Sequence, residues 1–408
     1  MPISKKQPGF GEFVMLIALI ISMVAMSIDA ILPALPEIAR DLGVKRINDS
    51  QYVISILFAG LALGQIIFGP LSDIIGRKPA INIGFAIFIA GCLLSLLARD
   101  YDDMLIGRFL QGLGAGGPRI IAIALVRDLY QGRQMARVMS FVMTIFILVP
   151  VIAPSIGQLI LAFFDWRAIF WMFLALASVT LVWFSLRQVE TLAKEKRSVF
   201  SLARMFADVK SICSIPATLG YTITMGLIFG AFVGYLSSSQ QIFQQQYGLG
   251  NQFALYFGVL AASIGLASLT NARLVMRLGM RRLSQVAVWA IVLLSVPFYP
   301  LADYFQGQPP LWLLMGYLML VFFFMGILFG NLNALAMEPL GNMAGLGAAL
   351  VGSVSTILSV ILGVLVSDAY NGTVLPLVAG FALLSLGCLI SIYWTEKRVP
   401  VLPESPGS

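Results

Sequence analysis

The stretch Gly69-Pro70-Leu71-Ser72-Asp73-Ile74-Ile75-Gly76-Arg77-Lys78-Pro79 carries charges between two long apolar segments. The apolar segments are residues 51–71 and 80–98. Each is about 20 residues long, the length that an α-helix needs to cross the hydrocarbon core of a bilayer. Proline follows Lys78 where a phosphate-binding loop needs Ser or Thr. The stretch therefore predicts a polar loop between two membrane-spanning helices, and not a nucleotide site.

The same alternation of apolar and polar segments continues along the chain. The 408 residues are 59% hydrophobic and 11% charged, with a mean hydropathy of +0.92, whereas a soluble domain carries about 25% charged residues. Apolar runs cover residues 13–35, 51–71, 80–98, 104–126, 138–162, 168–187, 214–236, 252–272, 284–302, 311–335, 345–367 and 373–394. We predict an all-α membrane protein with twelve transmembrane helices in two six-helix halves.

The longest charged stretch of the chain divides these runs into two sets of six. We therefore expect an N-terminal half at residues 1–187, a cytoplasmic linker at residues 188–213 and a C-terminal half at residues 214–408. A weak repeat relates the halves: Gly76-Arg77-Lys78 follows span 2, and Gly279-Met280-Arg281-Arg282 follows span 8. Paired halves of this kind are typical of secondary transporters.

Lysine and arginine residues are unevenly shared between alternate loops. With a cytoplasmic N-terminus, nineteen of the 26 fall in inside segments and five in outside segments, while Arg108 and Arg119 lie within a span. Positive residues gather on the cytoplasmic side of membrane proteins. We expect a multi-pass protein of the bacterial inner membrane, with both termini cytoplasmic and the lipid bilayer as its surroundings.

Several classes of function are disfavoured by composition. The chain has a net charge of +7, but its basic residues lie between apolar runs and form no patch for nucleic acid. It contains no histidine, and Cys92, Cys213 and Cys388 are far apart, so we expect no metal site, disulfide framework or cofactor. A membrane enzyme is disfavoured because no nucleophile with a base is visible.

Asp29 is the only carboxylate well inside a predicted span, and such a residue marks a functional site by default. Pro33 has no amide to donate to the Asp29 carbonyl, so the helix backbone opens there. Arg108 lies at a similar depth and is the expected partner. Burial favours the neutral acid and a guanidinium favours the carboxylate, which predicts proton exchange at Asp29. A permanent structural pair, or a solvated acid near the outer helix end, are the alternatives.

Arg119 follows Arg108 by 11 residues, which places both within about 20° of the same helix face. Gly112 lies between them on that face. The small residue leaves room either for a ligand or for a packed helix. Arg119 itself is either a substrate-cavity residue or a side chain that reaches the cytoplasmic surface.

Two further sets of residues complete the predicted site. A set for conformational gating comprises Gly69, Asp73, Gly76, Arg77 and Lys78 in the loop, and Pro150, Pro154 and Gly157, where prolines open the helix of span 5. A mixed aromatic and amide set could line a substrate cavity: Gln158, Tyr221, Tyr235, Tyr256, Asn331 and Asn333. Packing is the alternative for most of this second set.

Together these residues resemble the twelve-span drug:proton antiporters of the Bcr/CflA (bicyclomycin and chloramphenicol resistance) type in the major facilitator superfamily. Gly69–Pro79 is similar to the family's loop 2-3 signature, and Arg108-Phe109-Leu110-Gln111-Gly112 is similar to its span 4 motif. Ala153–Gly157 is similar to its antiporter motif, and Asp29–Pro36 is similar to its span 1 stretch with the acid. Ala124–Tyr130 is similar to its span 4 exit, and Asn333–Met337 is similar to a later motif. Gly157-Gln158 departs from the usual Gly-Gly. Pro118-Arg119 stands where relatives carry small residues, which points to a substrate preference of its own.

The resemblance implies a multidrug efflux antiporter that confers antibiotic resistance by alternating access. We expect a monomer that exports small amphipathic, amphenicol-like compounds against protons, with Asp29 and Arg108 coupling the two fluxes and the proton gradient as its energy source. A proton-coupled exporter of an endogenous sugar or amino acid is the alternative, and a receptor that transports nothing is a second one.

Overall fold

The computed structural model describes residues 8–197 and 209–398. Within these ranges twelve helices are long and apolar enough to cross a membrane, and no residue is in a strand. The predicted all-α fold of two six-helix halves is confirmed. The predicted linker, residues 188–213, lies partly outside the described residues, at 198–208.

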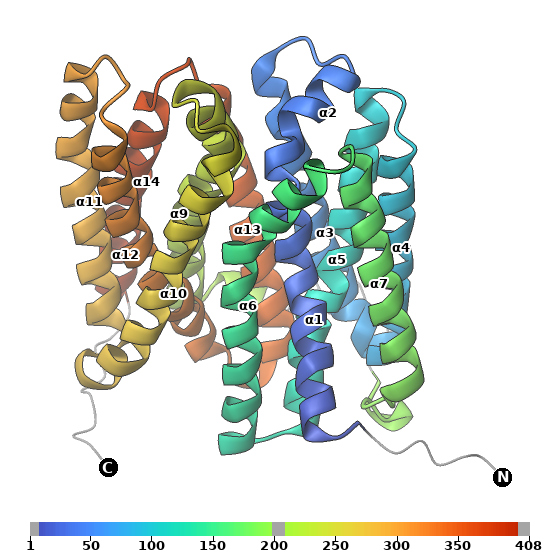
Figure 1. The fold of residues 1–408 in the computed structure, drawn as a ribbon. Coiled ribbons are helices and arrows are strands. Elements are labelled where there is room, and N and C mark those ends of the chain that lie inside the picture. The colour runs from blue at the N-terminus through green and yellow to red at the C-terminus, as the bar shows by residue number, and fades with distance from the viewer. Residues whose placement is uncertain (1–7, 198–208, 399–408) are drawn as a thin grey trace.

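Six long helices and several short ones form the first half (Figure 1). These elements are α1 (Phe10–Asp29), η1 (Leu32–Ala34), α2 (Leu35–Asp41), η2 (Ile47–Gln51), α3 (Tyr52–Ile75), α4 (Arg77–Leu96), α5 (Tyr101–Leu129), α6 (Gly132–Leu161), α7 (Arg167–Arg187) and η3 (Lys194–Lys196). The helix α5 packs against α3 and α4, while α1 packs against α6, α5 and α7.

The second half contains the other six long helices (Figure 1). Its elements are α9 (Pro216–Gln240), the π-helix η4 (Gln241–Gln246), η5 (Gly250–Gln252), α10 (Phe253–Leu278), α11 (Met280–Tyr304), α12 (Leu311–Met337), η6 (Glu338–Met343), α13 (Ala344–Asp368) and α14 (Leu375–Arg398). The helix α9 packs against α13, α14 and α12.

Two helix pairs form most of the interface between the halves: α3 packs against α13, and α6 against α10. The long helices run alternately up and down, so α1 begins and α14 ends at the same end of the bundle (Figure 1). We call this the proximal end, and the opposite end, where α2 lies, the distal end.

The weak sequence repeat corresponds to a repeated joint between helices. Gly76 lies between α3 and α4 with φ 108° and ψ 160°, and Gly279 lies between α10 and α11 with φ 73° and ψ 157°. Only glycine adopts this backbone conformation without steric cost. Each half therefore makes its first proximal turn, after its second long helix, in the same way, as expected of duplicated halves.

Candidate functional site

Asp29 is the last residue of α1, and the structure ends this helix where the sequence indicates. Pro33 provides no amide for the Asp29 carbonyl, and a 3₁₀ turn, η1, follows. The Asp29 side chain is only 4% exposed. Within the described part of the chain its carboxylate takes part in no hydrogen bond or ion pair. The site therefore holds a buried acid without a permanent partner.

Arg108 is completely buried, but it does not form the predicted ion pair with Asp29. Its guanidinium donates hydrogen bonds to the backbone carbonyl of Ser27 at 2.9 Å, to that of Val53 at 3.1 Å, and to Gln111 Oε1 at 2.7 Å. The Ser27 carbonyl belongs to the last turn of α1, where carbonyls lack helical donors and carry partial negative charge. Arg108 thus caps α1 from α5 and fixes the backbone two residues before Asp29.

The span 5 motif packs directly against the residue that follows Asp29. A Cβ atom at Gly157 would overlap the carbonyl oxygen of Ala30, so α6 crosses α1 with backbone contact there. Ala153, one turn earlier, and Pro154 are also buried. Only a residue without a side chain permits this approach, which explains the glycine in the motif. The backbone around Asp29 is consequently held by α5 on one side and α6 on the other.

Gly112 does not line a cavity, contrary to one of the two expectations. A Cβ atom at Gly112 would overlap the carbonyl oxygen of Leu57, because α3 fills the notch on α5. Arg119, on the same face, is half-buried and forms no hydrogen bond or ion pair with the described residues. It lies ten residues before the proximal end of α5, about 15 Å along the helix. The structure thus leaves a cation without a protein partner at membrane depth.

The other predicted cavity residues do not gather in one place. Gln158 donates to Asn251 Oδ1 at 3.0 Å and joins the two halves. Asn331 and Asn271 exchange two hydrogen bonds, of 2.8 and 3.1 Å, which tie α12 to α10. The two asparagines are therefore occupied by each other, whereas Gln158 uses its Nε2 group in the contact and its Oε1 atom is buried without a partner among the described residues. The amide Asn333, near the proximal end of α12, is exposed.

The three predicted tyrosines differ in their surroundings. Tyr221 is buried near the proximal end of α9. Tyr256 is half-buried and stacks on Phe243, with ring centroids 6.5 Å apart. Tyr235 is buried between two phenylalanine rings of the second half, and its hydroxyl has no hydrogen-bond partner. Of the three tyrosines, Tyr235 is the one with a buried hydroxyl that has no hydrogen-bond partner among the described residues.

An aromatic surface on α9 and α12 was not predicted from the sequence. Phe229 stacks on Phe329 with ring centroids 4.4 Å apart, and Phe232 meets Phe329 edge-on at 5.6 Å. All three rings are half-buried. Phenylalanine in a membrane helix is unremarkable by itself, so the sequence offered no signal that these three meet. Such rings can hold the apolar part of an amphipathic ligand.

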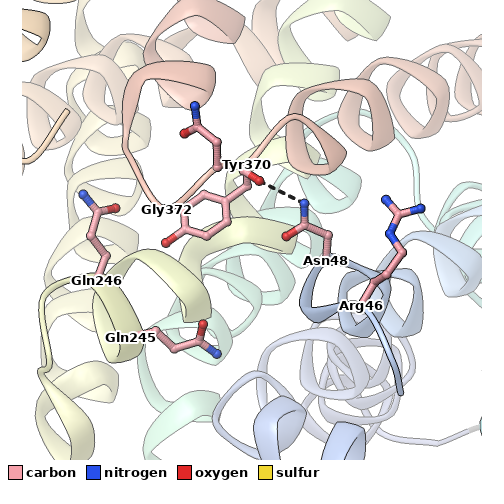
Figure 2. A pocket seen from close by; sticks show the side chains of 7 residues that line it. Arg46, Asn48, Gln245, Gln246, Tyr370 and Gly372 are labelled. Carbon is pink, nitrogen blue, oxygen red and sulfur yellow. Dashed lines mark hydrogen bonds between the residues drawn. The ribbon is translucent and has the colours of Figure 1, made fainter. Parts of the chain in front are cut away.

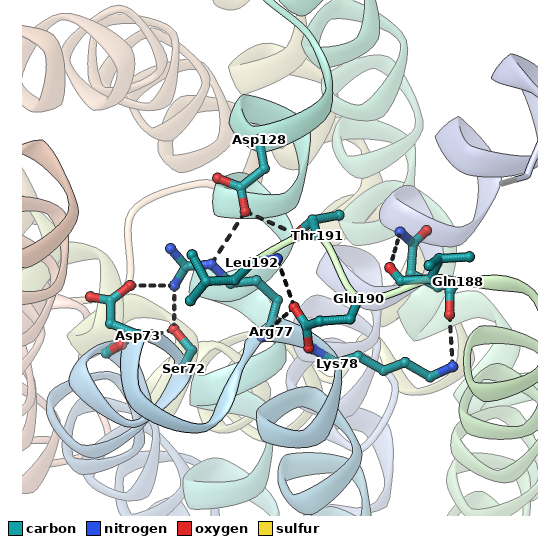
Figure 3. Close-up of polar contacts among 11 residues, drawn as sticks. Ser72, Asp73, Arg77, Lys78, Asp128, Gln188, Glu190, Thr191 and Leu192 are labelled. Carbon is teal, nitrogen blue, oxygen red and sulfur yellow. Dashed lines mark hydrogen bonds and ion pairs between the residues drawn. The ribbon is translucent and has the colours of Figure 1, made fainter. Parts of the chain in front are cut away.

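The loop 2-3 residues form a charge cluster at the proximal end (Figure 3). Arg77 Nη1 lies 2.6 Å from Asp73 Oδ1, and Arg77 Nε lies 3.3 Å from Asp128 Oδ2. The Glu190 carboxylate accepts hydrogen bonds from the backbone amides of Arg77 and Lys78, each of 3.0 Å. Asp73, Arg77 and Lys78 belong to the gating set predicted for this loop. The contributions of Asp128 and Glu190 were missed, because they come from distant parts of the chain.

Lys78 in the same cluster reaches the end of α7. Its ammonium group donates to the carbonyls of Ser185 and Gln188, each at 2.7 Å. The last carbonyls of a helix attract cations. The proximal cluster therefore joins α3, α4, α5 and the residues after α7 (Figure 3).

A second polar set, also missed, joins the two halves at the distal end. Asn48 donates to the carbonyl of Asp368 at 3.0 Å. It also donates to the carbonyl of Tyr370 at 2.9 Å (Figure 2). Gln51 donates to the side chain of Gln241 in the π-helix. We call these residues, with Ser55 and Ser237 at 3.4 Å, the distal lock.

A cavity of about 580 Å³, lined mostly by residues with polar side chains, opens beside the distal lock (Figure 2). Its lining comes from both halves: Arg46, Asn48, Gln245, Gln246, Tyr370, Asn371 and Gly372. The Arg46 guanidinium lies 3.3 Å from Asp368 Oδ1 across the same mouth. The distal mouth is therefore closed by direct contacts between the halves.

The twelve helices in two halves, with a repeated joint after the second helix of each, define a membrane transporter of the major facilitator type. The family model described as "Major Facilitator Superfamily" matches residues 15–364, and the chain belongs to this family. The expected resemblance to transporters of the bicyclomycin resistance type is confirmed by the relatives that follow.

The chain is 28% identical to "Bicyclomycin resistance protein homolog" of Haemophilus influenzae, over 95% of this chain and 96% of that protein. It is 29% identical to the MFS-type transporter YdgK of Bacillus subtilis, over 95% and 98%. It is 37% identical to "Multidrug resistance protein MdtL" of Klebsiella pneumoniae, over 35% of this chain and 36% of that protein. The crystal structure of the human organic anion transporter MFSD10 has the same fold, with a TM-score of 0.70 and 17% identity over 95% of this chain and all of that one.

Proposed function

We propose that the protein is a proton-coupled efflux antiporter that exports small amphipathic compounds by alternating access between its two halves. The observation that carries the proposal is Asp29, a buried carboxylic acid without a partner at the broken end of α1. A buried charge without compensation is costly, so the group gains or loses a proton as its surroundings change. A purely structural acid would be paired.

The proposal includes an orientation. The proximal end carries most of the lysines and arginines and corresponds to the cytoplasmic side of a bacterial inner membrane. The distal lock then closes the outer mouth, and the structure represents the state in which outer access is blocked. Opening it requires the amide contacts of Asn48 and Gln51 to break.

The proposed cargo follows from the chemistry of the interior and from the relatives. Half-buried rings of Phe229, Phe232 and Phe329 suit an apolar or aromatic body, and Arg119 suits a carbonyl or an anionic group. Relatives are named for resistance to bicyclomycin and to multiple drugs, which supports compounds of drug size, amphenicol-like ones included. We propose that a monomer performs this exchange. Export of an endogenous sugar or amino acid is the second candidate, because Arg119 would also suit a polar metabolite.

Proteoliposomes containing the full chain test this proposal. A pH gradient is imposed, and transport of amphenicols, lipophilic cations and sugars is compared for the wild type and Asp29→Asn. We expect gradient-driven transport of at least one drug class that is lost in Asp29→Asn. Asp303→Asn makes the same chemical change at an exposed position on α11 and is the matched control. Gradient-driven transport that survives in Asp29→Asn would remove Asp29 from coupling, and transport of sugars alone would favour the metabolite exporter.

A further inference from the structure

The cations at the proximal end differ between the two halves in whether they have partners. In each half the third long helix packs against the sixth: α4 against α7 in the first half, and α11 against α14 in the second (Figure 1). The third helix begins and the sixth ends at the proximal end, and both pairs carry cations at these termini. We call the place where α11 begins beside the end of α14 the proximal seam. The corner formed by α4 and α7 is its structural equivalent in the first half.

The cations of the first-half corner all have partners within the protein. Arg77 pairs with two aspartates, and Arg187 pairs with Glu12. The ammonium group of Lys78 donates to two carbonyls at the end of α7. The carboxylate of Glu190 adds a further negative charge on the first amides of α4. This corner is therefore neutralised by groups of the chain itself.

The cations of the proximal seam have no such partners. Within the described ranges of the chain, Arg282 forms no hydrogen bond or ion pair, and neither Lys397 nor Arg398 has a carboxylate within ion-pair distance. All three residues are exposed. Among the described residues, the negative charge that the first half supplies at this position has no counterpart in the second.

Two carboxylates do contact the first turns of α11, but they leave these three cations unpaired. Glu338 lies 3.9 Å from Arg281, in an exposed pair of a kind that contributes little. Glu396 accepts a hydrogen bond from Gln285. This bond joins α14 to α11 one turn from Arg282 and next to Lys397, so the cations of the two helices gather at one place.

The seam continues toward the middle of the membrane as an aromatic and aliphatic surface. The ammonium group of Lys397 lies 4.4 Å from the ring centre of Tyr393, and the guanidinium of Arg398 lies 4.7 Å from that of Trp394. Tyr393 is 62% exposed, and Ile390, one turn further in, is 71% exposed. Tyrosine and tryptophan are typical of the depth at which lipid headgroups lie. The cations on α14 are therefore held at headgroup depth, beside a surface that acyl chains can cover.

The helix α11 presents a similar surface. Arg282 is followed by Val286, Trp289 and Leu293, at intervals of four, three and four residues. Residues with this spacing lie on one face of a helix, and these three are each more than half exposed. Both helices thus carry an apolar surface that ends in cations at the proximal end. A soluble anion would use the cations alone, whereas a lipid would use both parts.

We propose that the proximal seam binds an anionic phospholipid, with Arg282, Lys397 and Arg398 around its phosphate and the apolar surfaces of α11 and α14 along its acyl chains. Guanidinium groups bind phosphate through paired, charge-assisted hydrogen bonds, and basic clusters beside membrane helices bind acidic headgroups. In the proposed orientation the lipid belongs to the cytoplasmic leaflet. Neither α11 nor α14 belongs to the helix pairs that form most of the interface between the halves, so this site is independent of Asp29.

Lipid binding to the full-length protein in detergent tests the proposal. Phosphatidylglycerol and phosphatidylcholine with the same acyl chains are titrated separately, and bound lipid is counted by native mass spectrometry. We expect the wild type to bind phosphatidylglycerol at least about tenfold more tightly. In Arg282→Gln/Lys397→Gln/Arg398→Gln this preference should fall by at least about tenfold, because the headgroup loses its cations. The single variant Arg282→Gln gives the same comparison with one change, and its preference should fall by about twofold or more.

A matched control removes the same charge from the same end of the protein. Arg127→Gln/Arg133→Gln/Arg273→Gln changes three exposed cations outside the seam, which likewise have no ion pair with the described residues. This control should keep the wild-type preference for phosphatidylglycerol within about twofold.

The possible outcomes separate this inference from its alternatives and from the proposed function. An unchanged preference in the seam variants overturns the site, and an equal loss in the control assigns lipid binding to general surface charge. Displacement of the lipid by glycerol phosphate at equal concentration would identify a site for a free anion and would also contradict the proposal. Asp29→Asn should bind phosphatidylglycerol as the wild type does. Failure of proton coupling at Asp29 would therefore leave the lipid site intact.

Discussion

Removing the Asn48 amide should open the distal mouth. Its Nδ2 group donates to the carbonyls of Asp368 and Tyr370, at 3.0 and 2.9 Å. Each such bond contributes about 1 kcal/mol, and the site is partly exposed, so Asn48→Ala should weaken the closed state by about 1–2 kcal/mol. At 1.4 kcal/mol per tenfold change, the closed-to-open ratio falls by roughly 5- to 30-fold. The variant keeps its packing within each half, since the lost bonds cross between the halves.

Spin labels on the two halves can measure this ratio. Leu97 and Tyr304 are exposed residues at the distal ends of α4 and α11, and they carry the labels after the three cysteines are replaced. Double electron–electron resonance then gives the distance distribution, and Asn48→Ala should enlarge the long-distance population. Asn371→Ala is the matched control, because among the described residues this amide at the same mouth bonds only to Thr373 of its own loop. An unchanged distribution in Asn48→Ala, or an equal change in both variants, would refute the assignment of the distal lock.

Three further predictions concern the other polar groups. Arg108→Lys should lose at least two of the three guanidinium bonds, because an ammonium group does not reproduce the guanidinium fork. The midpoint of thermal unfolding should therefore fall, and transport should be reduced. A wild-type midpoint would show that α1 does not need this cap. Glu190→Gln should lower the free energy of unfolding by about 1 kcal/mol, because it weakens the charged cap of α4. Its thermal unfolding midpoint should lie below that of Glu195→Gln, a control at an exposed position. Equal midpoints would contradict this prediction. Arg119→Ala should change resistance to compounds with an anionic or carbonyl group by at least several-fold, measured as resistance profiles in cells. An identical profile would indicate that the Arg119 side chain only reaches toward the surface.

The parts of the fold that were predictable are those encoded by local patterns. Twelve apolar runs predicted the twelve long helices, and Pro33 predicted the end of α1. The glycines at 76 and 279 marked the repeated joint. Membrane helices satisfy their backbone bonds internally, so a local apolar run is enough to specify one. Asp29 could likewise be identified from sequence, since an acid in such a run is costly wherever the helix packs.

Partners across the fold were less predictable. Arg108 was expected to pair with the nearest acid, but the structure directs it to the carbonyl of Ser27, a backbone group that no residue pattern displays. The proximal cluster needed Glu190, which is more than a hundred residues from Arg77. Gln158 and Asn331 looked like cavity residues, yet each has an amide partner on another helix. The residue type determines which hydrogen bonds a side chain can donate or accept, whereas the packing of the helices determines which partner it meets.

The distal lock illustrates a further reason why sequence alone is insufficient. In the proposed mechanism a transporter must populate two conformations, so residues at its mouths are bonded in one and solvated in the other. Neutral amides suit that role, because the net free energy of an amide bond is small and water replaces it readily. Ion pairs buried at the mouth would hold one state too firmly, since a buried charge without its partner is costly. The lock is accordingly built mainly from Asn48, Gln51 and Gln241, with Arg46 and Asp368 paired only at the exposed rim. In the sequence such residues resemble ordinary polar residues of loops. Their proposed function can be identified only from a structure in which both halves are in contact.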